Sequence, residues 1–108
     1  MAAEGVIRVS SKAQPGAYVT AAKTQLQSRT EVQLHGLGEA ITNTIRAADM
    51  LISLGYTTLR KFETQTLTEP DEAGETRKRA KVVITLAKAA TFDTALEEFE
   101  KSRSQAKP

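Results

Sequence analysis

The segment Gly36-Leu37-Gly38 has the residue types and spacing of a turn that could hold an anion. It follows an alternating stretch, Glu31 to His35, and apolar residues at helical spacing begin directly after it. Those apolar residues are Ile41, Ile45, Ala48 and Ile52. A strand that turns through glycines into a helix leaves backbone N–H groups free at the positive end of the helix dipole. Because many such turns only redirect the chain, this segment alone is a weak indication of a binding site.

A second group that could do chemistry is the basic run Arg77-Lys78-Arg79-Ala80-Lys81. Strand alternation would place Arg77, Arg79 and Lys81 on one face and Lys78 on the other. Such a face could neutralise the phosphates of a nucleic acid, or it could be a solvated strand that resists edge-to-edge aggregation. The net charge of +2 and a pI near 9.0 permit a polyanionic partner without requiring one.

The other reactive side chains do not predict an enzyme. His35 is the only histidine and the chain has no cysteine, so a zinc site would lack ligands. Asp71 and Glu72 are neighbouring carboxylates in a turn, and without a cleft they would be poor catalysts. No nucleophile, base and oxyanion donor form a recognisable pattern. We therefore expect no catalytic residue, no metal and no cofactor, and we interpret His35 as a surface or stacking residue.

The composition is that of one ordinary globular domain. The chain has 108 residues, of which 40% are hydrophobic and 26% are charged. No apolar run is long enough to span a membrane, and the first residues lack the order of a signal peptide. The absence of cysteine suits a reducing compartment, although it is compatible with any. We expect a protein of the cytoplasm, the nucleus or both, with no membrane partner.

Two strand–helix units must position the glycine turn. A short strand over residues 6–9 is followed by a helix that begins at Pro15. A second strand, residues 31–35, leads through the turn into a second helix, residues 39–54, which Gly55 ends. The apolar residues expected to face inward are Ile7 and Val9 in the first strand, Val19, Ala22 and Leu26 in the first helix, and the four named above in the second helix.

A hairpin must carry the basic run. Its first strand, residues 56–67, alternates imperfectly, because Leu59 shares a face with Lys61 while Phe62 lies opposite. Residues 68–75 form an exposed, mobile tip, and residues 77–87 form the last strand. In that strand Val82, Ile84 and Leu86 are predicted to point inward, and Val83 and Thr85 outward.

A short amphipathic helix is predicted to follow the hairpin. Thr91 is its N-cap, Phe92, Leu96 and Phe99 dock it, and it ends near Lys101 before a frayed tail over residues 102–108. The predicted fold is a two-layer α/β sandwich of order β-α-β-α-β-β, with helices on one face and an added C-terminal helix. Residues 5–90 form the domain, and residues 91–108 form the C-terminal helix and tail.

This order of elements, with these residues in it, resembles the eukaryotic branch of the Alba family of small nucleic-acid-binding proteins. The segments that carry the resemblance run from the first strand to the last: Ile7-Arg-Val-Ser10, Tyr18-Val19, Leu37-Gly-Glu-Ala-Ile41, Gly55-Tyr56, Lys61-Phe-Glu-Thr64 and Ala80-Lys-Val-Val-Ile-Thr-Leu86. The helix at Phe92 is similar to an extension of plant and protist members. The resemblance implies a dimer built from the second helices and the last strands, with nucleic acid lying across one face between two hairpins.

The resemblance also implies which residues contact nucleic acid. Lys12 matches a family lysine in the first strand-to-helix loop, and Gly38 matches the glycine that opens the second helix. The predicted binding residues are Lys12, Gly36, Leu37, Gly38, Arg77, Lys78, Arg79 and Lys81. Leu37 and Glu39 stand where archaeal members carry arginines, and Ala13 stands where they often carry a second lysine. Since neither Leu37 nor Glu39 can pair with phosphate, we expect weaker duplex binding and a preference for RNA or single strands.

The sequence therefore predicts a non-enzymatic nucleic-acid-binding dimer that favours RNA and has some capacity for DNA or RNA–DNA hybrids. The alternative is an assembly subunit of an RNA-processing ribonucleoprotein, which would pair with a different Alba-like chain. The choice between a homodimer and a heterodimer stays open at this point.

Overall fold

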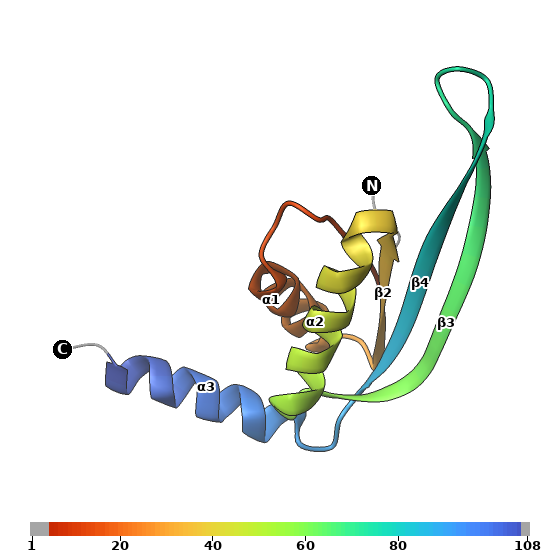
Figure 1. Ribbon diagram of the computed structural model, residues 1–108. Coiled ribbons are helices and arrows are strands. Elements are labelled where there is room, and N and C mark those ends of the chain that lie inside the picture. Colours follow the sequence, from red (N-terminus) through yellow and green to blue (C-terminus); the bar gives the residue numbers. More distant parts are fainter. Residues whose placement is uncertain (1–4, 107–108) are drawn as a thin grey trace.

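The computed structural model describes residues 5–106, which form one layer of helices on one face of a four-stranded sheet (Figure 1). The elements are β1 (Val6–Val9), α1 (Pro15–Leu26), β2 (Glu31–Leu37), a 3-10 turn η1 (Gly38–Ala40), α2 (Ile41–Ser53), β3 (Thr57–Pro70), β4 (Thr76–Lys88) and α3 (Phe92–Ala106). This is the predicted two-layer α/β fold with a C-terminal helix. None of the described helices is long and apolar enough to cross a membrane.

The sheet has the order β1-β2-β4-β3, so β2 and β4 lie in its centre. β1 runs parallel to β2, whereas β4 runs antiparallel to both β2 and β3. Ile7 and Val9 are buried as predicted, and so are Val19, Ala22 and Leu26 of α1. Helices α1 and α2 therefore cover one face of the sheet, and within residues 5–106 no helix covers the other face (Figure 1).

Helix α2 packs on the sheet with a different face from the predicted one. Its buried residues are Thr44, Ala47, Ala48 and Leu51. Of the predicted inward residues only Ala48 is buried; Ile41 is half-buried, and Ile45 and Ile52 are 44% and 38% exposed. Helix α2 lies close to the sheet, and a helix that lies close to a strand needs small side chains at the contact. The large apolar residues consequently point away from the core.

The hairpin β3–β4 extends well beyond the body of the molecule, which measures 56 Å in its longest dimension (Figure 1). Both strands are longer than predicted, and the residue pairing continues to Pro70 opposite Thr76. The connection is a short turn in which the Asp71 carboxylate accepts hydrogen bonds from the backbone N–H groups of Ala73 and Glu75, at 3.0 and 2.8 Å. The predicted loop over residues 68–75 is therefore shortened: residues 68–70 belong to β3, and residues 71–75 form the turn.

An irregularity in β3 corrects the predicted facing of its side chains. The register shifts between Leu59 and Lys61, so Leu59 lies opposite Leu86 and Phe62 lies opposite Ile84. Both apolar side chains consequently share the helix-side face, where the alternation had separated them. On β4, Val83 and Thr85 are buried although they point to the helix-free face, because neighbours on both flanking strands cover a central strand.

Helix α3 is attached through its first turn and then leads away from the body on the side opposite the hairpin (Figure 1). Phe92 is buried, and its ring meets that of Tyr56 edge-to-face at 5.8 Å. Thr91 directly precedes α3, at the predicted N-cap position, and its carbonyl accepts from the Ala95 N–H at 2.9 Å. Its hydroxyl donates to the Gly55 carbonyl at 2.7 Å, which ties α3 to the end of α2. Gly55 has φ +87°, the conformation expected of a residue that ends a helix.

The rest of α3 differs from the prediction in length and in docking. The helix continues to Ala106, so the predicted end near Lys101 is wrong, and residues 107–108 of the predicted tail lie outside the described residues. Leu96 is half-buried against the core. Phe99 is 43% exposed and lies beneath the Lys23 ammonium, which is 3.7 Å from its ring centre. Docking thus weakens along the helix.

Candidate nucleic-acid interface

The glycine turn and the basic run of the hairpin meet at one place. Gly38 has φ +58°, and a β-carbon built on it would lie 3.2 Å from a terminal nitrogen of the Arg79 guanidinium. Leu37, the last residue of β2, is paired with Lys81 of β4. The glycine turn and the basic run are thus neighbours in the fold, although about forty residues separate them in the sequence.

The two glycines of the turn have different structural roles. Gly36 is buried inside β2, and a β-carbon on it would overlap the Thr44 hydroxyl oxygen and lie 2.8 Å from the Thr44 β-carbon. The Thr44 hydroxyl in turn donates to the Ala40 carbonyl at 2.8 Å. Gly36 therefore allows α2 to approach the sheet, and a role for it in ligand contact stays a prediction. The turn requires the positive φ angle of Gly38, which glycine adopts readily.

The loop that carries Lys12 is fixed to the first turns of α2. The Asn43 side-chain amide donates to the backbone carbonyls of Ser10 and Ala13, both at 3.1 Å. The Ser10 N–H donates to the Tyr18 hydroxyl at 2.7 Å, and the Lys12 N–H donates to the Ser10 hydroxyl at 3.0 Å. Lys12 itself is exposed. These bonds hold the loop at the end of the molecule where η1 begins (Figure 1).

Asn43 is a positioning residue that the sequence analysis missed. It lies on α2, about thirty residues beyond the loop, and nothing in the local pattern of an amphipathic helix marks it. A polar residue at the start of a helix, close in sequence to the glycine turn, was the only available signal.

The hairpin basic residues divide into two pairs. Arg79 and Lys81 are half-buried near the glycine turn, and the Arg79 guanidinium makes an ion pair with Glu69 at 3.3 Å. Arg77 and Lys78 are exposed on the part of the β3–β4 hairpin that projects beyond the body, which we call the arm. They lie opposite Glu69 and Thr68. The structure therefore brings Arg79 and Lys81 to the turn and leaves Arg77 and Lys78 on the arm. The acidic residues of the tip, Asp71, Glu72 and Glu75, lie beyond them.

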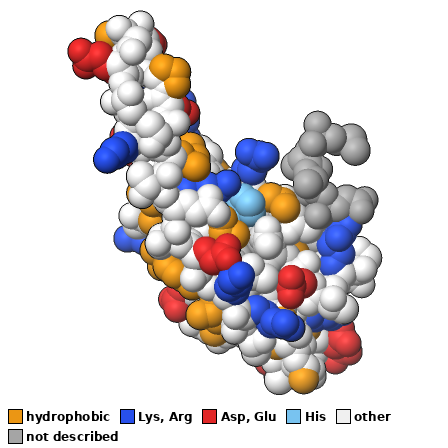
Figure 2. Space-filling view, turned by 90° about the vertical axis from the view of Figure 1, so that its right-hand side faces the viewer, with side chains coloured by type: hydrophobic (Ala, Val, Ile, Leu, Met, Phe, Trp, Pro, Cys, Tyr) orange, Lys and Arg blue, Asp and Glu red, His pale blue; other side chains and the backbone are white. Residues whose placement is uncertain are grey.

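The only histidine of the chain lies on the helix-free face of the sheet. His35 is half-buried, and its Nε2 lies 3.0 Å from the side-chain oxygen of Gln33. Burial lowers the pKa of the His35 imidazole below its ordinary value, and the positive charges of Lys81 and Arg8 lower it further. Figure 2 shows this face, with Lys and Arg side chains around the histidine.

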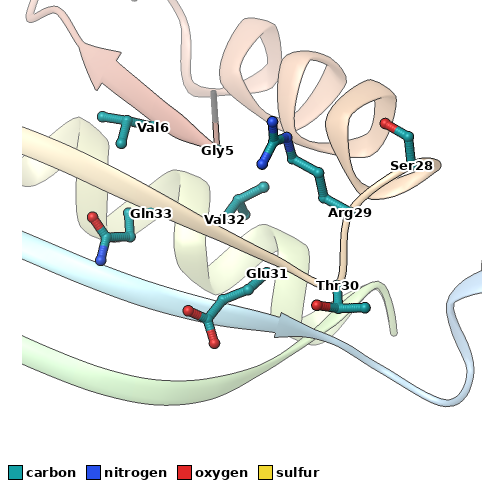
Figure 3. Close-up of a pocket in the computed structure, with 8 residues that line it drawn as sticks. All are labelled: Gly5, Val6, Ser28, Arg29, Thr30, Glu31, Val32 and Gln33. Carbon is teal, nitrogen blue, oxygen red and sulfur yellow. The ribbon is translucent and has the colours of Figure 1, made fainter. Parts of the chain in front are cut away.

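A shallow polar hollow of about 510 Å³ lies at the beginning of β2, and Gln33, the partner of His35, is one of its lining residues (Figure 3). It is lined by residues 5–6 and 28–33, and Figure 3 shows the side chains of Arg29 and Glu31 pointing to opposite sides of the strand. None of the predicted site residues lines it. Within the described residues no group of three or more His, Asp or Glu side chains is placed to hold a metal ion.

Comparison with known proteins agrees with this geometry. The family model for Alba matches residues 5–69. An uncharacterized protein of Arabidopsis thaliana is 34% identical over 93 residues, which cover 82% of this chain and 72% of the plant protein. ALBA1 from Trypanosoma brucei superposes with a TM-score of 0.79 at 24% identity, covering 97% of this chain and 87% of its own. Alba from Thermoplasma volcanium superposes with a TM-score of 0.69 at 21% identity, covering 77% and 99%.

The family match extends from the N-terminal strand, through the Lys12 loop and the glycine turn, into the first strand of the arm. The structural neighbours have the same fold, and the plant relative covers most of the chain. The expected family is thereby confirmed, whereas the assignment to its eukaryotic branch stays a prediction. This chain belongs to the Alba family, whose members are generally nucleic-acid-binding proteins.

Proposed function

We propose that this protein is a non-enzymatic nucleic-acid-binding dimer of the cytoplasm or nucleus, and that it favours RNA while retaining some capacity for DNA or RNA–DNA hybrids. The observation that carries the proposal is the meeting of three segments at one end of the fold. Asn43 fixes the Lys12 loop to α2, and Arg79 of the hairpin lies against Gly38. Each segment brings a cation or a close backbone approach to the same end.

The arm adds reach to this binding end. Arg77 and Lys78 are exposed on a two-stranded ribbon that projects past the body, so they can follow a phosphate backbone that rests on the turn (Figure 1). Each phosphate that is neutralised releases counterions, which gives a log–log salt slope of about −0.9 on duplexes and about −0.7 on single strands. The binding predicted here is therefore electrostatic and depends strongly on salt.

The preference for RNA rests on the residues beside Gly38. Leu37 is apolar and half-buried, and Glu39 is exposed in the first turn of η1. Neither side chain can form the bidentate pair with a duplex phosphate that an arginine forms, and the Glu39 carboxylate repels phosphate at short range. A flexible single strand can pass Glu39 at a greater distance than a rigid duplex can.

The proposed dimer rests on an exposed apolar surface between α2 and β3, which we call the apolar patch. Its exposed members are Ile45 and Ile52 of α2 and Leu59 and Phe62 of β3, which are 38–54% exposed. A hollow of about 180 Å³ lies among them, with Ala48, Asp49 and Ile84 completing its lining. Burial of apolar surface contributes about 25 cal/mol per Å² before the costs of association, so a second copy seated here would gain stability.

The test of nucleic-acid binding replaces Lys12, Arg77, Lys78 and Arg79 together with alanine. None of the four is in the buried core, so the variant should fold. We expect weaker binding to a single-stranded oligouridylate, duplex DNA and an RNA–DNA hybrid, with a flatter salt slope because fewer counterions are displaced. Fluorescence anisotropy titrations at two salt concentrations measure both the affinity and the salt slope.

The matched control compares two double variants that each remove two positive charges. Arg77→Ala with Lys78→Ala removes the exposed cations of the arm, and Arg60→Ala with Lys101→Ala removes two exposed cations elsewhere. If both double variants weaken binding equally, only net charge matters, and the proposed contact between the arm and the nucleic acid is wrong. Unchanged affinity and slope in the quadruple variant would also contradict it.

The apolar patch also favours the second candidate, an assembly subunit that pairs with a different Alba-like chain. Such a chain could cover the same four side chains, and RNA affinity would then require both partners. Light scattering of the purified protein, combined with the same titration, separates the candidates. A dimer that binds RNA alone supports the first proposal, whereas a monomer that binds RNA poorly supports the second.

A further inference from the structure

Three nitrogen-bearing side chains lie together on the helix-free face of the sheet, and we call them the Arg8–His35–Lys81 group. Arg8 of β1 lies directly beside His35 of β2 in the parallel register. His35 lies opposite Val83 of β4, so Lys81, two residues along β4, is its diagonal neighbour. Their sequence neighbours Ile7, Val9, Leu34 and Val82 are buried, which places the group on the face without helices (Figure 2).

Among the described residues this group lacks acidic partners, whereas three other cations of the sheet have one. Arg60 Nε lies 3.9 Å from a carboxylate oxygen of Glu31. Lys61 Nζ lies 2.6 Å from a carboxylate oxygen of Glu63, and Arg79 Nη1 lies 3.3 Å from one of Glu69. In the described part of the chain, neither Arg8 nor Lys81 has an acidic side chain within ion-pair distance. Arg8 and Lys81 flank His35 from the two adjacent strands, so both positive charges act on its imidazole.

The surroundings of His35 agree with this interpretation. Charged groups face it from β1 and β4, namely Arg8 and Lys81, and both are positive. On β2 its same-face neighbours are Gln33 and Leu37, and the next acid along that strand is Glu31. In the same row across the sheet, Glu63 of β3 lies beyond Val83 and is paired with Lys61. Within residues 5–106, no carboxylate is placed to offset the two positive charges.

We infer that the Arg8–His35–Lys81 group is a further binding site for a phosphodiester of the nucleic acid, and that His35 takes up a proton from solvent when the phosphate binds. This inference rests on the proposed function and adds a second contact surface to it. Lys81 and Arg79 are on the same face of β4, so a strand gripped at Arg79 can continue over Lys81 toward Arg8 without crossing the helices. With Gln33 accepting from Nε2–H, Nδ1 is the nitrogen that gains the proton.

The direction of the pH dependence follows from linkage. In the free protein, burial and the two cations hold the pKa of His35 below its ordinary value. A bound phosphate supplies negative charge beside the ring and raises that pKa, so binding takes up protons. Affinity therefore rises as the pH falls from above the bound pKa toward the free one. A pKa difference of one unit between the two states corresponds to about a tenfold change in affinity.

The experiment uses the full chain and a single-stranded oligouridylate, and it exploits the presence of one histidine. The ring resonances of His35 are the only histidine signals in a proton–carbon NMR spectrum, so its pKa can be measured with and without the oligonucleotide. We expect the resonances to shift on binding and the pKa to rise. Affinity should increase several-fold, within the roughly tenfold limit of a one-unit shift, between about pH 7.5 and about pH 5.5. Inorganic phosphate serves as a second probe, which should move the same resonances at higher concentration.

Two variants and one control keep the test decisive. His35→Gln should remove most of the pH dependence, so the several-fold gain in affinity between about pH 7.5 and about pH 5.5 should be lost. Arg8→Gln should weaken binding and reduce the salt slope by about 0.7, the contribution of one single-strand phosphate. Lys61→Gln, which removes an acid-paired cation of the same sheet, should leave the slope unchanged.

The failure of this inference differs from the failure of the proposed function. If oligouridylate binds with a salt slope that depends on the arm, but the His35 resonances stay in place and His35→Gln keeps the parental pH dependence, only the helix-free site is wrong. If no oligonucleotide binds at either pH, both are wrong. A shift with inorganic phosphate but none with oligouridylate would show that the site takes a small anion instead of a strand.

Discussion

The two faces of α2 are built in opposite ways. The face toward the sheet carries Thr44, Ala47, Ala48 and Leu51, three of which are small, and all are buried. The other face carries the larger Ile45, Met50 and Ile52, which are 38–44% exposed. In a helix whose core is complete, the large apolar residues would be expected inside. Close packing against the sheet accounts for the inner face, and the proposed pairing of two chains would account for the outer one.

The largest expected effect comes from shortening a side chain on the inner face. Leu51 is fully buried, and Leu51→Ala should lower the free energy of unfolding by about 2–5 kcal/mol, because it removes buried methyl groups and leaves a cavity. Its matched control is the next residue, Ile52→Ala, which removes a side chain that is 38% exposed and should cost about 1 kcal/mol or less at low protein concentration. Urea unfolding measures both. Equal losses would show that the two faces do not differ as described.

A second prediction concerns what makes the inner face small. Gly36→Ala should lower the free energy of unfolding by about 1–3 kcal/mol, because its β-carbon overlaps Thr44 and lies 3.1 Å from the Ala40 carbonyl. Gly16→Ala is the control, since a β-carbon there meets nothing within 4 Å, and alanine in a helix should add about 0.5–1 kcal/mol of stability.

A double-mutant cycle sharpens the same point. Gly36→Ala combined with Thr44→Ala should lose less stability than the two single losses added together, because the hydroxyl in the overlap is gone. Additive losses would mean that the tight contact between β2 and α2 does not explain the glycine.

Local patterns predicted most of the elements, because alternation and helical spacing are properties of neighbouring residues. Ile7, Val9, Val19, Ala22 and Leu26 are buried as predicted, since they recur with the period of the strand and the helix that carry them. The pattern failed for α2 because hydrophobicity alone does not show which apolar face of a helix packs on the sheet. It failed for Leu59 because the irregularity before Lys61 depends on pairing with β4, which local alternation does not contain.

The site could be predicted only in part for the same reason. The residue types at Gly38 and in the basic run were visible, but their contact is set by the register of Leu37 opposite Lys81. Asn43 joins α2 to carbonyls about thirty residues earlier, and that distance is invisible to a pattern of a few residues. The Arg8–His35–Lys81 group likewise comes from three strands and has no motif.

The smallest effect on folding, and the most direct test of the outer face, comes from placing a charge there. Ile45→Glu puts a carboxylate on an exposed helix position, so the variant should unfold at nearly the same urea concentration at low protein concentration. In a dimer that buries the apolar patch, the same carboxylate would lose water without gaining a partner, which is strongly unfavourable. Ile45→Glu should therefore be a monomer under conditions in which the parent is a dimer.

The control for that variant is Leu54→Glu, which lies on the same chain segment, is 53% exposed and does not line the hollow between α2 and β3. It adds the same charge, so it should leave the dimer intact if the apolar patch is the interface. Light scattering across a range of protein concentrations gives the masses of both variants. Because dimerisation stabilises the folded state by mass action, the parent should also gain resistance to urea as its concentration rises, and Ile45→Glu should not. If both variants dissociate, or neither does, the outer face of α2 has some purpose other than pairing two copies.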